Sequence, residues 1–383
     1  MRITDDIRYV GVNDHDIDLF EGLYPVPEGV SYNSYVIMDE KIAVMDAVDA
    51  SFGGTWLTNV RKALDNRTPD FLIVHHMEPD HSASIALFMD AFPEAVIVSS
   101  QKAFPMMKAF FGEDYAARRM VVKEGDVLCL GKHTLTFVAA PMVHWPEVIM
   151  TYDRTDKVLF SADAFGKFGA LDVEADWACE ARRYYFGIVG KYGSQVQAVL
   201  KKAAALDVEV VCPLHGPVLQ GGQLAEALRL YDLWSSYTPE DQGVVIAHAS
   251  VYGNTRTAAE TLANILREKG VKVAIHDLTH CDISEAVEDA FRYDRLVLAA
   301  ATYNADVFPP MRSFITWLTE RGYRNRTAGM IENGSWAPMA AKVMRGMLEG
   351  SKDLTVLEPV VTIRSALNED STAQLQTLAD ALV

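Results

Sequence analysis

The chain has 383 residues, of which 50% are hydrophobic and 23% are charged, a composition typical of a globular protein of two or three domains. This composition excludes a disordered or fibrous chain. The formal net charge of −17 repels a phosphate backbone, so we expect no nucleic-acid partner.

The N-terminus and the cysteines indicate the compartment. Residues 1–16 lack the basic start and apolar core of a signal peptide, and no stretch approaches the ~20 apolar residues of a membrane span. The four cysteines lie far apart without a C-x-x-C pair, which predicts neither a thiolate metal site nor a disulfide framework. We therefore expect a cytoplasmic protein without membrane contact.

The first half of the chain reads as short apolar or β-branched strands with intervening helices. Strands outnumber helices there, and a hairpin is expected within 121–140. The expected strands lie at 34–38, 42–48, 71–76, 95–100, 121–140, 148–153, 157–163 and 208–215.

From residue 244 onward, strands and helices alternate regularly. Five strands, each followed by a helix, predict a doubly wound five-stranded parallel sheet. A helix near 222–235 precedes SSYTPEDQG, whose Pro, acids and Gly predict a linker. We place the domains at 1–243 and 244–383.

A motif of metal-binding side chains follows the strand in FLIVHHMEPDHSAS, residues 71–84. In an extended segment, His76, Glu78 and Asp80 point the same way. Pro79 is expected to keep this stretch from closing into a helix. His81 is either a further ligand or a residue that hydrogen-bonds a ligand.

Three more candidates each follow an apolar strand: His144, Asp163 and His215. Together with the four side chains of the first motif, these make seven candidate ligands, which is more than one ion needs. We therefore expect two metals, bridged by Asp163 or by a water-derived oxygen. The neighbouring His75 and Asp46 are expected to be structural, with Asp46 organising the loop beneath the site.

The motif H-x-E-x-D-H, followed by H-W-P, S-A-D and L-H-G-P, resembles the metallo-β-lactamase-like domain of flavodiiron proteins. The segment FEGLYPVPEGVSYNSY, residues 20–35, resembles the opening of the same family. The resemblance implies an αββα sandwich with two irons per chain. It assigns His76, Glu78 and His144 to one iron, Asp80, His81 and His215 to the other, and Asp163 to the bridge.

Hydrolytic relatives in the wider superfamily carry histidine in place of Glu78. A hard anionic oxygen there favours iron over the tetrahedral preference of zinc. Tyr24 and Trp145 are candidates for contact with substrate, as is Tyr32, and the alternative for each is an ordinary core or rim aromatic.

The second half begins with a strand, a hydroxyl- and Gly-bearing turn and a helix in VVIAHASVYGNTRTAAETLANIL, residues 244–266. Hydroxyls and backbone N–H groups at a helix N-terminus favour a phosphate. Neither G-x-G-x-x-G nor a Gly-Lys-Ser/Thr loop is present, so a monophosphate, FMN, is expected. The residues of this turn are Ser250, Val251, Tyr252, Gly253, Asn254 and Thr255.

Two more loops follow strands of the second half, and strand ends at a topological switch point bring such loops together. Tyr303 and Trp336 are expected to flank an isoalloxazine ring, and this half resembles flavodoxin throughout. The loops consist of Thr302, Tyr303 and Asn304, and of Asn333, Gly334, Ser335 and Trp336.

Together the two sites predict an O₂ and/or NO reductase, because two electrons from a diferrous pair and two from reduced FMN equal the four that O₂ needs. The resemblance implies a head-to-tail homodimer, alone or as a dimer of dimers. No rubredoxin module is seen, so we expect an external donor, rubredoxin in preference to a reduced deazaflavin. The alternatives are a zinc-dependent hydrolase with a flavodoxin-like accessory domain, and an electron carrier whose metal domain has lost iron.

Overall fold

The computed structural model describes residues 2–383, which form two compact units. The first unit runs to Tyr185 and resumes at Tyr192–Asp232, and the second consists of Phe186–Lys191 and Leu233–Val383. The domain boundary that we predict from the sequence, between residues 243 and 244, lies inside strand β17 (Asp241–Ala249). The division of the chain into domains at this point stays a prediction.

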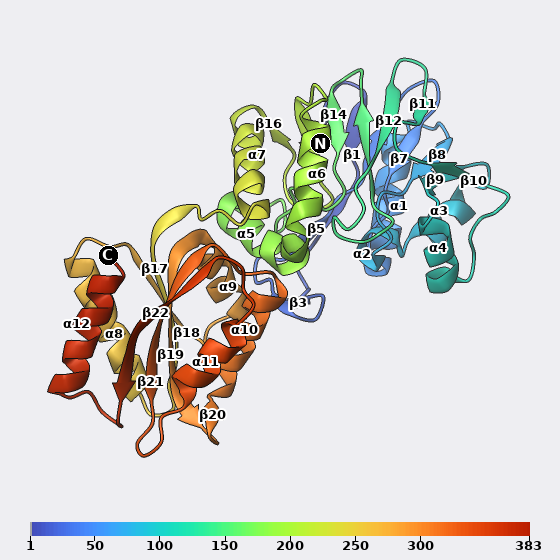
Figure 1. The fold of residues 1–383 in the computed structure, drawn as a ribbon. Helices are drawn as coiled ribbons and strands as arrows, with labels where there is room; N and C mark the ends of the chain where they lie inside the picture. The colour runs from blue at the N-terminus through green and yellow to red at the C-terminus, as the bar shows by residue number, and fades with distance from the viewer. Residues whose placement is uncertain (1) are drawn as a thin grey trace. The chain divides into compact units, whose positions relative to one another are not determined.

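The first unit contains two six-stranded sheets, in the orders β1-β6-β7-β8-β9-β10 and β11-β12-β13-β14-β15-β16 (Figure 1). The strands of the first sheet are β1 (Ile7–Tyr9), β6 (Tyr35–Ile37), β7 (Ala43–Met45), β8 (Phe71–Ile73), β9 (Val96–Ser100) and β10 (Arg119–Val122). Those of the second are β11 (Val127–Cys129), β12 (Thr134–Ala139), β13 (Ile149–Asp153), β14 (Val158–Phe160), β15 (Val210–Cys212) and β16 (Leu219–Gln220).

Two small ladders and several helices complete the first unit. The ladders pair β2 (Val12–Asp14) with β5 (Val30–Tyr32) and β3 (Leu19–Phe20) with β4 (Tyr24–Pro25). The helices are α1 (Gly53–Ala63), α2 (Pro79–Ser82), α3 (Ile85–Ala91), α4 (Ala103–Phe111), α5 (Trp177–Tyr184), α6 (Gly193–Ala203) and α7 (Gly221–Ser235), of which the last three residues belong to the second unit.

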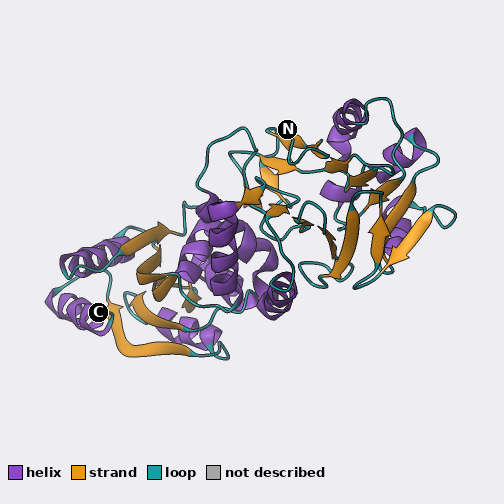
Figure 2. Ribbon diagram, turned by 90° about the horizontal axis from the view of Figure 1, so that it is seen from above, coloured by secondary structure: helices purple, strands orange, loops and turns teal. Residues whose placement is uncertain are grey.

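The core of the first unit lies between its two sheets. Tyr35 and Ile73 of the first sheet share one buried cluster with Phe137 and Phe160 of the second. Strands β6, β7 and β8 are buried along their whole length, which requires cover on both faces. Helices supply the outer cover (Figure 2), so the expected αββα sandwich is confirmed. Residues 121–140 serve both sheets, because β10 joins β9 while β11 and β12 form the expected hairpin.

The second unit is built on the parallel sheet β18-β17-β19-β21-β22, to whose β19 the short β20 adds antiparallel. This confirms the predicted doubly wound five-stranded sheet. Figure 1 shows α8 and α12 on one side of it and α9, α10 and α11 on the other. The remaining strands are β18 (Val273–Asp277), β19 (Tyr293–Tyr303), β20 (Asp306–Val307), β21 (Arg326–Asn333) and β22 (Leu354–Ile363). The helices are α8 (Asn254–Glu268), α9 (Ile283–Arg292), α10 (Pro309–Glu320), α11 (Ala340–Leu348) and α12 (Glu369–Ala381).

The second unit also takes one segment from the middle of the first half. Phe186 stacks on Phe291 with ring centroids 4.0 Å apart, and the Tyr237 hydroxyl donates to the Gly190 carbonyl over 2.7 Å. Within residues 2–383, none of the helices combines the length and the apolar run that crossing a membrane requires.

Candidate metal centre

The first group of metal-binding side chains combines His76, Glu78 and His144 with Asp163. The Nε2 atoms of His76 and His144 lie 3.2 Å apart, and both approach Glu78 Oε2, at 3.2 and 3.1 Å. Asp163 Oδ2 lies 3.2 Å from the His76 nitrogen and 3.3 Å from that of His144. Four ligand-type atoms from the segments that follow three strands, β8, β12 and β14, therefore face one point.

The second group consists of Asp80, His81 and His215. The two Nε2 atoms lie 3.0 Å apart, and Asp80 Oδ2 lies 3.3 Å from His81 and 3.2 Å from His215. The other oxygen of Asp163, Oδ1, lies 3.3 Å from His81 Nε2 and 3.7 Å from His215 Nε2. Asp163 thus turns one oxygen to each group.

These separations fit a pair of metal ions. Two ligand atoms about 2.1 Å from a common ion lie about 3.0 Å apart at a right angle and about 3.4 Å apart at a tetrahedral angle. Both carboxylate oxygens of Asp80 and of Asp163 are buried and accept no hydrogen bond from residues 2–383. A buried carboxylate without donors is costly unless a cation meets it. The structure therefore brings together all seven side chains that we predict as ligands.

The backbone after β8 differs from our prediction. Glu78 is extended (φ −60°, ψ 138°), but Pro79 occupies the first turn of α2, so the expectation that Pro79 prevents a helix is wrong. Proline lacks only an N–H that the first turn of a helix leaves unpaired. As a result, Asp80 turns away from His76 and Glu78 and joins His81 in the second group.

Two acceptors hold the histidine rings from behind. Glu147 Oε1 accepts from His76 Nδ1 over 2.8 Å and from the Met77 N–H over 2.9 Å. The Ser31 carbonyl accepts from His215 Nδ1 over 2.7 Å. Since a carbonyl can only accept, His215 Nδ1 carries the hydrogen, and in the neutral ring the Nε2 lone pair faces the site.

Sequence reasoning missed Glu147 and Ser31. The glutamate follows His144 by three residues, in H-W-P-E, and a buried acid beside a predicted ligand is a usable signal. The Ser31 contact uses a backbone carbonyl, which leaves no trace in residue type. His81 Nδ1 is buried without an acceptor among residues 2–383.

The charges of the site shift its pKa values in opposite directions. Burial by itself raises the pKa of Asp163, but the nearby rings of His76, His144 and His81 bring it well below its usual range. Burial by itself lowers the pKa of His144, but Asp163 and Glu78 raise it to about 9. Opposite charges thus dominate over desolvation.

His75 and Asp46 have the structural role that we expect. His75 Nδ1 pairs with the Asp46 carboxylate and Nε2 lies 2.7 Å from the Thr151 hydroxyl, so both ring nitrogens point away from the candidate ligands. Asp46 also accepts from the His75 N–H over 2.7 Å, which ties the loop to the end of β8.

The predicted pocket aromatics occupy different places. Trp145 packs edge-on against His76, with centroids 5.0 Å apart, and lies 5.9 Å from His144. Tyr32 lies 6.0 Å from His215 and donates to Asp14 Oδ2. Tyr24 is buried against Phe168, at 5.6 Å. Sequence reasoning missed two further rings against His215, Phe20 at 5.3 Å and Tyr184 at 5.4 Å.

The second unit carries a cavity of about 660 Å³ at the carboxyl ends of its strands. Every loop residue that we predict for the cofactor lines this cavity except Gly253, which instead precedes α8 with φ 94° and donates to the Ser250 hydroxyl. Tyr252 and Trp336 are 94% and 88% exposed there. Large exposed aromatic faces beside a helix N-terminus fit a flat ring that carries a phosphate.

Some polar groups of these loops form hydrogen bonds with other residues of the second unit. The Thr302 hydroxyl accepts from the N–H groups of Met339 and Ala340, at the start of α11. Asn333 exchanges two hydrogen bonds with the backbone of Ser365, a cavity residue that sequence reasoning missed. Ser365 follows β22, so the rule that ligands bind beyond strand ends is the signal that points to it.

Models of two known protein families match the two halves of the chain. A model described as "ODP family beta lactamase" matches residues 30–216, and one described as "Flavodoxin domain" matches residues 245–355. The nitric oxide reductase of Moorella thermoacetica is 28% identical over 378 residues, which cover 94% of this chain and 92% of the relative.

Two solved structures extend the likeness over the whole chain. Rubredoxin oxygen:oxidoreductase from Desulfovibrio gigas matches with a TM-score of 0.91 and 26% identity, covering 100% of this chain and 98% of the other. The flavodiiron protein from Giardia intestinalis matches in fold, with a TM-score of 0.90 and 24% identity, covering 99% of this chain and 96% of the other.

Proposed function

This chain belongs to the flavodiiron proteins, and from that premise we propose that it is an oxidoreductase that reduces O₂ to water, NO to N₂O, or both. The observation that carries the proposal is the position of Asp163, whose two oxygens each face one group of candidate ligands. A carboxylate so placed would hold two ions, and two redox-active ions together can bind and reduce a small diatomic substrate.

We assign His76, Glu78 and His144 to one iron and Asp80, His81 and His215 to the other, with Asp163 between them. When bound, two ferrous irons and reduced FMN supply four electrons, as many as O₂ needs and twice what the coupling of two NO needs. The chain itself contributes rigid placement. Glu147 and the Ser31 carbonyl orient two of the imidazoles, so that the Nε2 atoms of His76 and His215 face the other candidate ligands.

Glu78 supports iron in preference to zinc. Its Oε2 is the anionic oxygen that meets both His76 and His144 in the first group, where a histidine would offer a neutral nitrogen. Two histidines and a carboxylate on one side of an ion are typical of non-haem iron sites but also hold catalytic zinc, so the flavodoxin-like unit, whose cofactor a hydrolase does not need, is the stronger ground for iron. This argues against the alternative of a zinc-dependent hydrolase.

We propose that the cavity of the second unit holds FMN. The turn 250–255 would bind the phosphate through its N–H groups and hydroxyls, while Tyr303 and Trp336 would flank the ring. For the metal site, we propose that Trp145 and Tyr24 limit the space beside the irons and exclude water from it. Trp145 is the better placed of the two, because it contacts two candidate ligands.

We propose a cytoplasmic protein that receives electrons from an external donor, with rubredoxin favoured over a reduced deazaflavin. The support is a relative that is named for the pair rubredoxin and oxygen. We also propose a head-to-tail homodimer, alone or as a dimer of dimers, and a division into domains at 1–243 and 244–383. Sedimentation of the loaded protein tests the dimer.

Gas consumption by a bridge variant tests the proposed function. Protein loaded with iron and FMN, and reduced chemically, should consume O₂ or NO, and Asp163→Asn should lose this activity while it keeps its FMN. Glu124→Gln is the matched control, because Glu124 is a carboxylate that bonds Ala139 N–H and Lys202 away from the site. Full gas consumption by Asp163→Asn, or hydrolysis by a zinc-loaded protein that leaves both gases untouched, would contradict the proposal.

A further inference from the structure

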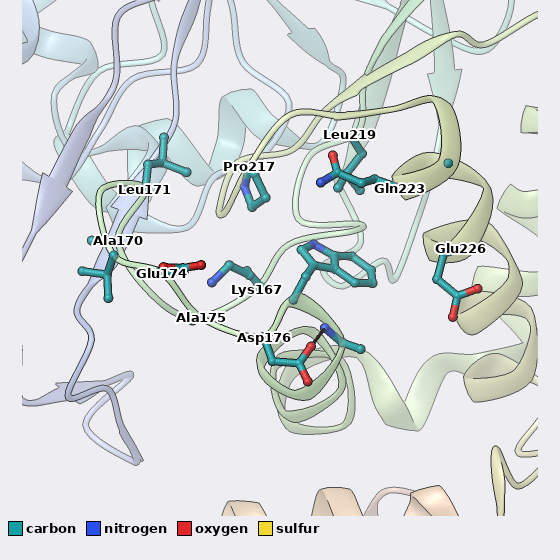
Figure 3. A pocket seen from close by; sticks show the side chains of 14 residues that line it. Lys167, Ala170, Leu171, Glu174, Ala175, Asp176, Pro217, Leu219, Gln223 and Glu226 are labelled. Atoms are coloured by element: carbon teal, nitrogen blue, oxygen red, sulfur yellow. Dashed lines mark hydrogen bonds between the residues drawn. The ribbon is translucent and has the colours of Figure 1, made fainter.

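The first unit contains a cavity of about 500 Å³ that takes no part in the metal centre. It lies between segment 170–178 and the start of α7 (Figure 3), which shows Lys167 and Glu174 on one side and Gln223 and Glu226 on the other. Its size falls within the range of small-molecule pockets, about 300–1,000 Å³. The apolar part of its wall comes from Ala170, Leu171, Val173, Trp177, Pro217 and Leu219.

One buried cation lies in this mostly apolar wall. Lys167 is only 5% exposed, and its Nζ donates to the carbonyl of the next residue, Phe168, over 2.9 Å. No carboxylate among residues 2–383 pairs with it, although an ammonium offers three donors. Burial lowers the pKa of Lys167, and the carboxylates of Glu180, Asp176 and Glu28 offset this only in part. A buried ammonium with one neutral acceptor is costly unless an anion completes it.

Two glycines make room for this side chain. Gly216 has φ 77°, and a Cβ there would lie 2.7 Å from Lys167 Cγ. Gly169 has φ 99°, and a Cβ there would lie 3.0 Å from Nζ. Both positions therefore favour glycine for their backbone conformation and for the space that they leave. The ammonium is held at the wall of the cavity by its surroundings.

The acids around the mouth do not neutralise Lys167, and two of them are occupied elsewhere. Asp176 Oδ1 accepts from the Ala178 N–H over 3.0 Å, at the start of α5. Glu226 forms a two-pronged pair with Arg229, at 2.8 and 2.6 Å. Glu174 is exposed at the rim. The charge that the interior lacks is thus negative, and among residues 2–383 only one of the three acids at the mouth, Glu226, is paired with a cation.

We propose that this cavity binds a small organic molecule that has a carboxylate at one end and an apolar or aromatic body. The carboxylate would meet Lys167 Nζ, and the body would pack against Trp177, Leu171 and Leu219. The site is independent of the iron centre and of the proposed gas reduction, so its test stands apart from theirs.

Isothermal titration calorimetry with 4-phenylbutyrate and its neutral amide tests the site on protein loaded with its cofactors. The acid should bind once per chain and at least about tenfold more tightly than the amide, because only the acid makes a charge-assisted contact. Lys167→Met should raise the Kd of the acid at least about tenfold and change the Kd of the amide by less than about twofold. Lys201→Met, an exposed lysine of α6, is the matched control and should change neither.

A second variant keeps the test decisive if Lys167→Met folds poorly, which circular dichroism and iron content would reveal. Gln223→Trp places an indole into the cavity from α7 and leaves Lys167 in place, so it should weaken acid and amide alike. Equal binding of acid and amide to the unaltered protein, no saturable binding of the acid, or undiminished binding to Gln223→Trp would overturn the proposal.

Discussion

Glu147 offers a sharp perturbation of one metal position. Its side chain is fully buried, and a single oxygen accepts from both His76 Nδ1 and the Met77 N–H. Leucine at this position removes both hydrogen bonds. Loss of the partner of a ligating histidine typically costs about 10–100-fold in metal affinity. The unpaired Met77 N–H adds about 1–3 kcal/mol of lost stability.

Anaerobic titration of the metal-free protein with ferrous iron, against a competing chelator, measures the two binding steps separately. Glu147→Leu should weaken the step that belongs to His76, Glu78 and His144 by about 10–100-fold. The other step should change by less than about threefold, since Glu147 contacts none of its side chains. Glu147→Gln, which keeps an acceptor oxygen, should fall between. Glu124→Gln controls for the loss of a carboxylate that also bonds a backbone N–H. Equal losses at both steps, or none at either, would refute the reasoning.

Three further perturbations test other parts of the structure. Asp163→Asn should weaken both iron steps, unlike Glu147→Leu, because each of its oxygens faces a different group; the same chelator titration measures this. Trp336→Ala should raise the Kd for FMN about tenfold, as measured by fluorescence quenching. The indole is 88% exposed and free to stack on the flavin ring, and alanine removes this contact. Burial by itself lowers the pKa of His276, but Asp289, 2.9 Å away, and to a lesser extent Cys281 raise it to about 9. Asp289→Asn should therefore destabilise the fold by about 1–3 kcal/mol below pH 6.5, and the difference should vanish as the pH rises through 9, as measured by urea unfolding.

Each of these has its own control and its own contrary outcome. For Asp163, loss of a single step would show that it serves one ion. For Trp336, the phenylalanine variant should retain most of the FMN affinity, and an unchanged Kd in the alanine variant would place the ring elsewhere. For Asp289, a destabilisation that is the same at pH 6 and pH 9.5 would mean that the pair contributes through packing and not through charge.

Much of the site could be predicted because the chemistry resides in residue types at strand ends. His76, His144, Asp163 and His215 each follow a short apolar strand. The packing of the first sheet, which contains β8, against the second, which contains β12, β14 and β15, brings the strand ends together. What the pattern could not determine was the local backbone. Pro79 is compatible with both an extended segment and the first turn of a helix, and only the packed structure selects the turn that moves Asp80 to the second group.

Two kinds of contact could not be predicted from the sequence: those made by backbone groups, and those made by a segment that packs far from its neighbours in the chain. The Ser31 carbonyl that orients His215 comes from a residue 184 positions away, and any residue type could supply it. Segment 186–191 lies between helices of the first unit in the sequence, but Phe186 packs against Phe291 in the second unit. Such pairings depend on tertiary packing, which local periodicity does not encode.

Anaerobic stopped-flow mixing of the fully reduced protein with O₂ and with NO, alongside metal analysis of the same sample, tests the central claim most directly. We predict two irons per chain and one FMN, whose reoxidation accompanies the loss of about one O₂ or of NO in pairs. Zinc in place of iron, or flavin that stays reduced in the presence of both gases, would contradict the assignment of these seven side chains to a gas-reducing iron pair.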